Sequence, residues 1–102
     1  MKTRGAYLIQ KERERQIEEE GWTEEHDKHH TTEEFIKAAI AYLMYNIDSK
    51  VTDYKYVAKV SWWPWDKQWY KPKTKLRNLV RAGALIAAAI DKLQKDEENG
   101  MV

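Results

Sequence analysis

The sequence predicts a small all-α domain of about three helices. Apolar residues recur at intervals of three and four over residues 32–47 and 74–96, which is the periodicity of amphipathic helices. Gly21 has the character of a residue that ends a preceding helix. Both prolines, Pro64 and Pro72, fall in one aromatic-rich segment between the periodic stretches, where regular structure is not expected.

The composition is that of one globular domain covering residues 1–102, in which residues 97–102 are expected to fray. The chain has 102 residues, 42% of them hydrophobic, and no cysteine, so neither a disulfide framework nor a thiolate metal site is expected. No apolar run approaches the length of a membrane span, and the N-terminus lacks a secretory signal. These features favour a cytoplasmic protein. The modest size makes homo-oligomerisation plausible.

The first helix is expected over about residues 6–20, with Gly21 in the left-handed conformation just after it. It is weakly amphipathic, and its only plausible inward stripe is Ile9, Arg13, Gln16 and Ile17. A partly buried guanidinium needs a carboxylate or phosphate partner, which makes Arg13 a candidate ligand-binding residue.

The second helix is expected over residues 32–47. Thr31 and Glu34 have the spacing of a capping box. The predicted inward stripe is Phe35, Ile36, Ala39, Ile40, Leu43, Met44 and Ile47. Residues 50–63 are rich in strand-forming residues without a clear partner, and we interpret them as an extended loop or one arm of a short hairpin.

The third helix is expected over about residues 74–96, with Thr74 as its N-cap. Its predicted inward face is Leu76, Leu79, Val80, Gly83, Ile86, Ala87, Ile90 and Leu93. Gly83 costs about 1 kcal/mol relative to alanine in mid-helix. Either a closely packed helix or an indole lying over it would offset that cost.

Residues 62–73, called here the aromatic segment, carry four of the five tryptophans and both prolines. One interpretation is that the indoles pack across the second and third helices. The other is that aromatic faces and cations clamp a flat anion, with help from the amide groups at the start of the third helix. The candidate residues for such a site are Trp65, Trp69, Lys71, Lys73, Arg77 and Arg81. We expect at least half of the indoles to belong to the core.

Charge is distributed unevenly along the chain. Residues 12–34 hold ten acidic residues against three basic ones, whereas residues 50–81 hold nine basic residues against two acidic ones. An acidic helix packed against a basic half explains this pattern, and so does recruitment of an external anion by the basic half.

A metal site has weak support. His26, Asp27 and His30 resemble two helical zinc ligands one turn apart, but no third ligand is evident. Lys37 stands where a carboxylate would complete a magnesium motif that begins at Glu33. Motifs of a nucleophile elbow, a phosphate-binding loop, a zinc finger or a helix-turn-helix are missing. No cofactor and no sequence-specific nucleic-acid binding are therefore expected.

Two stretches carry a family resemblance: residues 12–27, which include Gly-Trp-Thr-Glu-Glu-His-Asp, and residues 63–86, which include Trp-Pro-Trp-Asp, Lys-Pro-Lys and Ala-Gly-Ala-Leu-Ile. Together they resemble a family of short uncharacterised proteins of tailed phages and prophages. The opening Glu-Arg-Glu-Arg-Gln also resembles the MazG-like nucleotide pyrophosphohydrolases, whose acidic metal motif this sequence lacks.

The resemblance implies a non-enzymatic phage accessory protein in the cytoplasm of an infected bacterium. Such a protein would counter host defence by binding a host defence protein or by sequestering a nucleotide-type small molecule. Two alternatives stay open. One is a divergent MazG-like hydrolase with a rearranged metal site, and the other is a structural module that self-associates.

Overall fold

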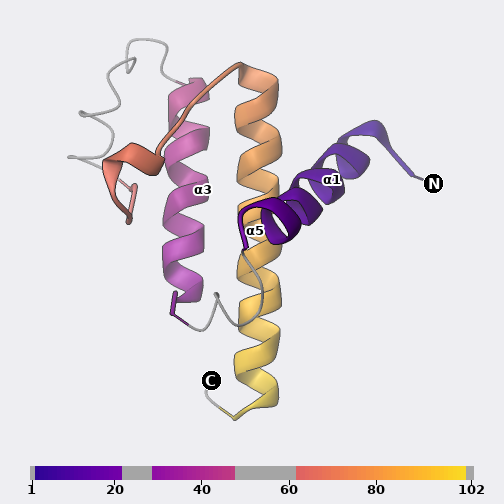
Figure 1. Ribbon diagram of the computed structural model, residues 1–102, viewed down its shortest axis with the longest axis vertical. Helices are drawn as coiled ribbons and strands as arrows, with labels where there is room; N and C mark the ends of the chain where they lie inside the picture. The colour runs from indigo at the N-terminus through magenta and orange to yellow at the C-terminus, as the bar shows by residue number, and fades with distance from the viewer. Residues whose placement is uncertain (1, 22–28, 48–61, 101–102) are drawn as a thin grey trace.

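The protein is all-α, and three helices form its framework. The computed structural model describes residues 2–21, 29–47 and 62–100, and contains α1 (Arg4–Glu19), α3 (Thr32–Ile47), the short 3-10 helix η1 (Lys67–Trp69) and α5 (Lys75–Glu98). Helices α3 and α5 run antiparallel side by side, and α1 crosses α5 (Figure 1). The predicted fold class is thereby confirmed. Among the described helices, none has both the length and the apolar character needed to cross a bilayer.

The helix ends follow the predicted capping residues closely. Thr31 and Glu34 form the reciprocal capping box: Glu34 N donates to Thr31 Oγ1 at 3.1 Å, and Thr31 N donates to Glu34 Oε2 at 2.6 Å. Thr74 accepts from Arg77 N at 3.2 Å at the start of α5. Gly21 has a φ of +72° just beyond the end of α1, as expected of a glycine there.

Two predicted boundaries need correction. Helix α1 begins at Arg4 rather than near residue 6, because the Thr3 hydroxyl caps it by accepting from Ala6 N at 3.2 Å. Helix α5 extends to Glu98, so the predicted frayed tail at residues 97–102 begins with two helical residues. The aromatic segment also contains one turn of 3-10 helix, η1, where no regular structure was expected between the prolines.

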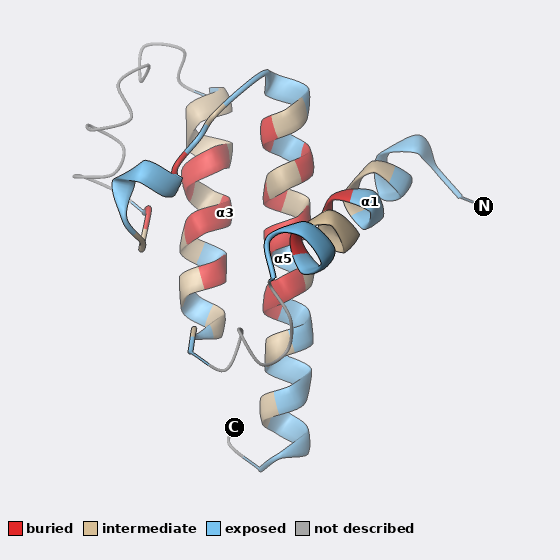
Figure 2. Cartoon of the chain, viewed as in Figure 1, coloured by how far each residue is buried: buried red, intermediate tan, exposed pale blue. Residues whose placement is uncertain are grey.

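The seam between α3 and α5 is built mainly from alanine. Ala38 and Ala39 on α3 and Ala82, Ala88 and Ala89 on α5 are all buried, and Figure 2 shows the buried positions of both helices concentrated along this seam. Small side chains let two helix backbones approach closely. The predicted close approach of another helix to the small-residue part of α5 is therefore confirmed.

The predicted inward stripe of α5 is largely wrong, and that of α3 is wrong at Ile36 and Ile47. Most of their large aliphatic residues point outward on one side of the helix pair, which we call the rear face and define as Ile36, Ile47, Leu76, Leu79, Ile86, Ile90 and Leu93. The exposed fractions of these residues range from 38% to 84%. Phe35, Ala39 and Val80 are buried as predicted. The alanine seam and the aromatic segment occupy the sides of the helices that the aliphatic periodicity does not mark.

Helix α1 turns part of its predicted stripe inward, including Gln16 and Ile9, and also buries Glu12, which the prediction did not include. Glu12 and Gln16 are each 3% exposed, whereas Ile17 is 37% exposed. Ile9 lies over Gly83 of α5, where an added Cβ would meet Ile9 Cδ1 at 2.5 Å and Cγ1 at 2.7 Å. Among the described residues, the nearest neighbour of Gly83 is therefore Ile9 of a packed helix rather than an indole.

The aromatic segment packs against α3 and is tied to α5 at its end (Figure 1). The Tyr70 hydroxyl donates to the carbonyl oxygen of Ala41 at 2.9 Å. Asn78 of α5, which is fully buried, accepts from Lys73 N at 2.7 Å and donates to Asn46 Oδ1 of α3 at 2.9 Å. Asn78 therefore joins the segment and both long helices. The predicted extended loop or hairpin arm at residues 50–63 lies almost entirely outside the described residues.

Candidate functional site

A cavity of about 690 Å³ lies among α1, α3, the aromatic segment and α5. Its volume falls in the range typical of small-molecule sites. The residues that line it combine aromatic rings with charges of both signs: Glu12, Arg15, Gln16, Glu20, His30, Phe35, Tyr42, Trp63, Trp65, Asp66, Trp69, Lys71, Arg81 and Leu85. The site is thus assembled from three regions that are distant in the sequence: α1, the α3 region, and the continuous stretch from the aromatic segment into α5.

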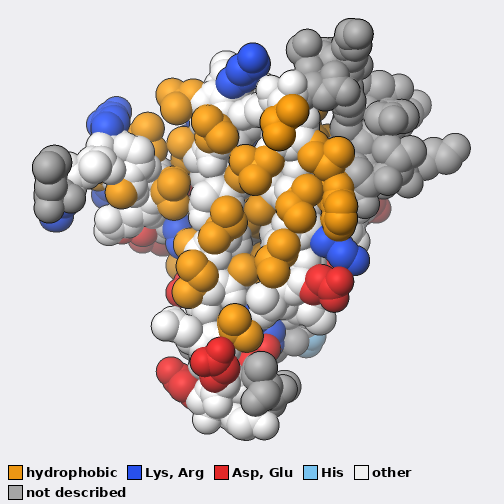
Figure 3. All heavy atoms as spheres, turned by 180° about the vertical axis from the view of Figure 1, so that it is seen from behind, with side chains coloured by type: hydrophobic (Ala, Val, Ile, Leu, Met, Phe, Trp, Pro, Cys, Tyr) orange, Lys and Arg blue, Asp and Glu red, His pale blue; other side chains and the backbone are white. Residues whose placement is uncertain are grey.

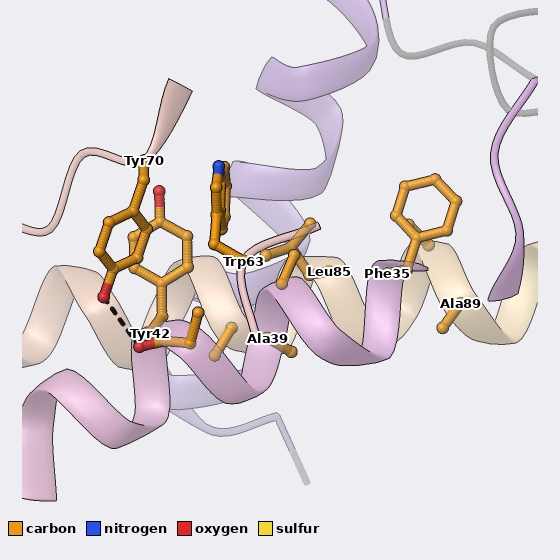
Figure 4. Packing of buried hydrophobic residues seen from close by; sticks show 11 residues of the cluster. Phe35, Ala39, Tyr42, Trp63, Tyr70, Leu85 and Ala89 are labelled. Atoms are coloured by element: carbon orange, nitrogen blue, oxygen red, sulfur yellow. Dashed lines mark hydrogen bonds between the residues drawn. The ribbon is translucent and has the colours of Figure 1, made fainter. Parts of the chain in front are cut away.

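Edge-to-face contacts between rings form the aromatic wall of the cavity. The Trp63 ring meets the rings of Tyr42 and Trp65 at centroid distances of 5.6 and 5.3 Å, with interplanar angles near perpendicular. Trp65 also meets Phe35 at 5.7 Å. Figure 4 shows Tyr70, Tyr42 and Trp63 grouped at one end of the cluster and Phe35 at the other. These geometries stabilise aromatic pairs beyond the burial of their area, so the wall is a rigid one.

Each indole nitrogen of the wall has a fixed acceptor. Trp63 Nε1 donates to the Asp66 carbonyl oxygen at 3.0 Å, and Trp65 Nε1 donates to Glu34 Oε1 at 3.1 Å. Partial burial would raise the pKa of Glu34, but hydrogen bonds from Thr31, Trp65 and His30 lower it below its usual range. Glu34 is therefore an ionised anchor that joins the α3 cap to the wall.

The four indoles of the aromatic segment divide evenly between core and surface. Trp63 is buried and Trp65 packs partly buried against the core, whereas Trp62 and Trp69 are 40% and 60% exposed. The expectation that at least half of them are core is confirmed. Trp69 is the exposed indole that lines the cavity, which leaves a ring face available to a ligand.

A buried carboxylate forms the α1 side of the cavity. Glu12 accepts two hydrogen bonds from Arg15, at 2.9 and 2.7 Å, and one from Arg77 Nη2 at 2.8 Å. Burial alone would raise the pKa of Glu12, but the bonds from the two guanidinium groups lower it from 4.5 to about 2. The same carboxylate raises the pKa of Arg15 above its usual value. The acidic floor of the cavity is thus neutralised by fixed cations.

Two further cations, Lys71 and Arg81, line the cavity. Arg81 Nη1 donates to the Lys71 carbonyl oxygen at 2.8 Å, and its guanidinium lies 6.0 Å from the Tyr42 ring centroid. The Lys71 ammonium lies 5.7 Å from the Trp69 ring centroid. Arg81 Nε and Gln16 Oε1 are buried polar atoms without a hydrogen-bond partner in the described part of the chain. Such atoms cost about 1–3 kcal/mol each, so two residues that line the cavity have unused hydrogen-bonding capacity.

Four of the six candidate residues predicted around the aromatic segment meet in this cavity, namely Trp65, Trp69, Lys71 and Arg81. Lys73 and Arg77 do not line it: the backbone of Lys73 is bound to Asn78, and Arg77 turns toward Glu12. Arg13 lies outside the cavity as well. As a partly buried guanidinium, it has the expected carboxylate partner, Asp91 of α5 at 3.3 Å.

The predicted metal residues do not converge in the described residues. His26 and Asp27 lie outside them. His30 places Nδ1 3.4 Å from Glu34 Oε1 and packs edge-on against Phe35 and Trp65. Over residues 2–21, 29–47 and 62–100, no three histidine, cysteine, aspartate or glutamate side chains group in the manner of metal ligands.

Two important residues were not predicted, Glu12 and Asn78, and Gln16 was predicted to face inward but not to line the cavity. Glu12 stands in a run of alternating acids and bases, Glu12-Arg13-Glu14-Arg15, that is typical of a solvent-exposed helix face. Asn78 interrupts an apolar stretch of α5, and its neighbours in the sequence do not mark it as a buried residue. Each becomes important only through contacts with a distant segment, and no local sequence signal reports those contacts.

Neither a protein-family model, nor a curated protein, nor a solved structure matches the chain.

Proposed function

We propose that this protein binds a nucleotide-type small molecule in the cavity between α1, α3, the aromatic segment and α5. The observation that carries the proposal is the meeting of an exposed indole, Trp69, with two cations, Lys71 and Arg81, at one cavity of about 690 Å³. A flat heteroaromatic ring can stack on the indole, and the cations can balance an attached phosphate.

The electrostatics of the cavity support a ligand of low negative charge. Arg15 and Arg77 are committed to the buried Glu12, so they compensate an internal charge and offer little to an external one. Lys71 and Arg81 make no carboxylate contact shorter than 4.0 Å within the described residues. A monophosphate or a cyclic nucleotide therefore fits the available charge better than a triphosphate does.

The biological setting is a proposal of its own. The resemblance to short tailed-phage and prophage proteins supports a role for this binding in an infected bacterial cell. There the protein would withhold a nucleotide signal from host defence. We propose this role as the consequence of ligand binding at the cavity, and it depends on that binding.

The test is a nucleotide panel applied to the purified protein. Linear and cyclic mononucleotides should raise the melting temperature by several degrees when present well above the dissociation constant. Trp69→Ala should weaken binding roughly 10-fold or more, since stacking on an aromatic ring contributes about 1–3 kcal/mol per base. Isothermal titration calorimetry gives the dissociation constants.

A matched control comes from the same segment. Trp62 is also an exposed indole, but it does not line the cavity, so Trp62→Ala should bind as the wild type does. Equal losses in the Trp62 and Trp69 variants would mean that stacking at the cavity is not the cause. The absence of any melting shift across the panel would overturn the proposal. Chromatography of each nucleotide after incubation with magnesium, manganese or zinc separates binding from hydrolysis.

A further inference from the structure

The rear face of α3 and α5 carries the second proposal, which is independent of the cavity. Seen from behind, hydrophobic side chains cover the joint surface of the two helices, and charged side chains gather toward its edges (Figure 3). The exposed fractions of its seven isoleucine and leucine residues correspond to an apolar area on the order of 700 Å². The largest apolar patch on a typical monomer covers roughly 300–600 Å². A standard protein interface buries about 800 Å² on each partner. The rear face therefore has the size of an interface.

The apolar residues on this side of α5 have the spacing of a coiled-coil interface. Counted from Leu76, the stripe falls at residues 76, 79, 83, 86, 90 and 93, in alternating steps of three and four, and all of these positions except 83 are exposed. This alternation keeps one narrow stripe facing a partner helix along the whole length of a coiled coil. Only position 83 lacks a side chain, and Ile9 of α1 fills the space beside it.

We propose that the rear face is the interface of a homodimer, in which the α5 helices of two copies pair antiparallel about a two-fold axis near Ile86. In that register Ile86 meets Ile86 of the second copy, and Leu79 of each copy meets Leu93 of the other. The stripe is therefore self-complementary when reversed. A two-fold interface requires this property, because one patch must match itself.

The charges at the two ends of α5 select the antiparallel arrangement. Lys75 lies at the first turn and Glu97 at the last, and both are exposed. In the proposed register, Lys75 of one copy stands beside Glu97 of the other, and the symmetry produces this contact twice. A parallel pairing would place like charges together at both ends, which is unfavourable.

The second helix contributes to the same interface. Asn46 of α3 accepts from Asn78 of α5, and the helices run antiparallel, so Ile36 lies at about the level of Ile86 and Ile90. Ile36 is 45% exposed there. It lies beside the proposed axis and would extend the apolar contact from one helix to two.

A bilayer surface is the main competing occupant, and the charge pattern argues against it. Helices that lie on membranes usually carry lysine and arginine around the apolar face, which attracts anionic lipid. Here the charges have opposite signs at the two ends of α5, with Lys75 at one end and Glu97 at the other. This separation of opposite charges favours pairing with the antiparallel α5 helix of a second copy.

Sedimentation velocity over about 1–200 µM tests the proposal. The wild type should sediment as a species of twice the monomer mass of 12.2 kDa. Ile86→Glu should be monomeric throughout, because it places two carboxylates at the axis. Gln68→Glu, which adds the same charge on the exposed η1, should leave the dimer intact. Circular dichroism confirms that each variant is folded.

A charge exchange tests the register without touching the apolar stripe. Lys75→Glu alone and Glu97→Lys alone should each weaken association several-fold, and the double variant should restore it.

A wild type that is monomeric at every concentration would overturn the proposal. If that monomer floated with vesicles of equal parts phosphatidylcholine and phosphatidylglycerol, the face would be a membrane surface instead. A dimer that survives Ile86→Glu would also overturn it, since another surface would then be responsible.

Discussion

At the scale of single residues, Glu12 connects α1 to the rest of the molecule. Its carboxylate accepts from Arg15 on its own helix and from Arg77 on α5, and it is 3% exposed. An acidic helix against a basic half was one of two interpretations of the charge pattern, and this contact supports it. The sequence could not distinguish Glu12 from Glu14, because both stand in the same run of alternating acids and bases. Only the structure shows that Glu14 is the more exposed of the two and pairs with Lys11.

Replacing Glu12 should lower the stability of the protein by an amount that depends on pH. Glu12→Gln should lower the free energy of unfolding by about 1–3 kcal/mol at neutral pH, since two guanidinium groups lose an ionised acceptor. The folded-state pKa of Glu12 is lowered from 4.5 to about 2, so its stabilisation is present above pH 4.5 and is lost as the pH falls through about 2. Urea unfolding followed by tryptophan fluorescence measures the difference at each pH.

The control for this prediction lies one half-turn away. Glu14 is 43% exposed and pairs with Lys11 at 3.4 Å, so Glu14→Gln should change stability by less than about 1 kcal/mol. The difference between wild type and Glu12→Gln should narrow from pH 4.5 downward. A difference that stays constant to pH 2 would show that the ion pairs are not its source.

At the scale of elements, helix ends were predictable and helix orientations were not. Thr31, Glu34, Thr74 and Gly21 act within a few residues of the chain, so their capping roles can be inferred locally. Which face of a helix turns inward depends on what covers it. Ile86 and Ile90 follow the apolar period as faithfully as any core residue and are nevertheless exposed, whereas the buried residues of α5 are Asn78, Val80, Ala82, Ala84, Leu85, Ala88 and Ala89. A periodic apolar stripe indicates a buried surface without saying whether its partner is the same chain.

The α1–α5 crossing makes a prediction about Gly83. In an ordinary helix, glycine to alanine stabilises by about 1 kcal/mol. Here the new Cβ would lie 2.7 Å from Ile9 Cγ1, which is close to the stiff branch point of that side chain, so α1 must shift. Gly83→Ala should therefore destabilise the protein by about 1 kcal/mol. Chemical denaturation at one low protein concentration provides the measurement.

A double-mutant cycle separates the contact from helix propensity. In an Ile9→Ala background the space over Gly83 is open, and Gly83→Ala should become stabilising by up to about 1 kcal/mol. The reversal of sign is the decisive feature. If Gly83→Ala had the same effect in both backgrounds, Ile9 would not be the residue that requires glycine there.

At the scale of the whole molecule, the two long helices present two different surfaces. The side that faces α1 and the aromatic segment contains the cavity, with Trp69, Lys71 and Arg81 at its border. The opposite side is the aliphatic rear face (Figure 3). The sequence predicted a shared site for the aromatic and cationic residues because they are neighbours in the chain. It missed the α1 side of the cavity, since Glu12 and Gln16 reach it only through the tertiary crossing of α1 and α5.

If the cavity and the rear face act independently, thermal unfolding should show separate effects of nucleotide binding and of dimerisation on the melting temperature. For a dimer whose unfolding is coupled to dissociation, a tenfold increase in protein concentration should raise the melting temperature by about 3 °C, given the unfolding enthalpy expected for two chains of this length. Ile86→Glu should melt at a temperature independent of concentration.

A nucleotide that binds in the cavity should raise the melting temperatures of the wild type and of Ile86→Glu alike, because the cavity and the rear face share no residue. Differential scanning calorimetry at several concentrations, with and without nucleotide, measures both effects. A nucleotide shift that disappears in Ile86→Glu would mean that ligand binding requires the dimer, and the two surfaces would then be coupled through α5.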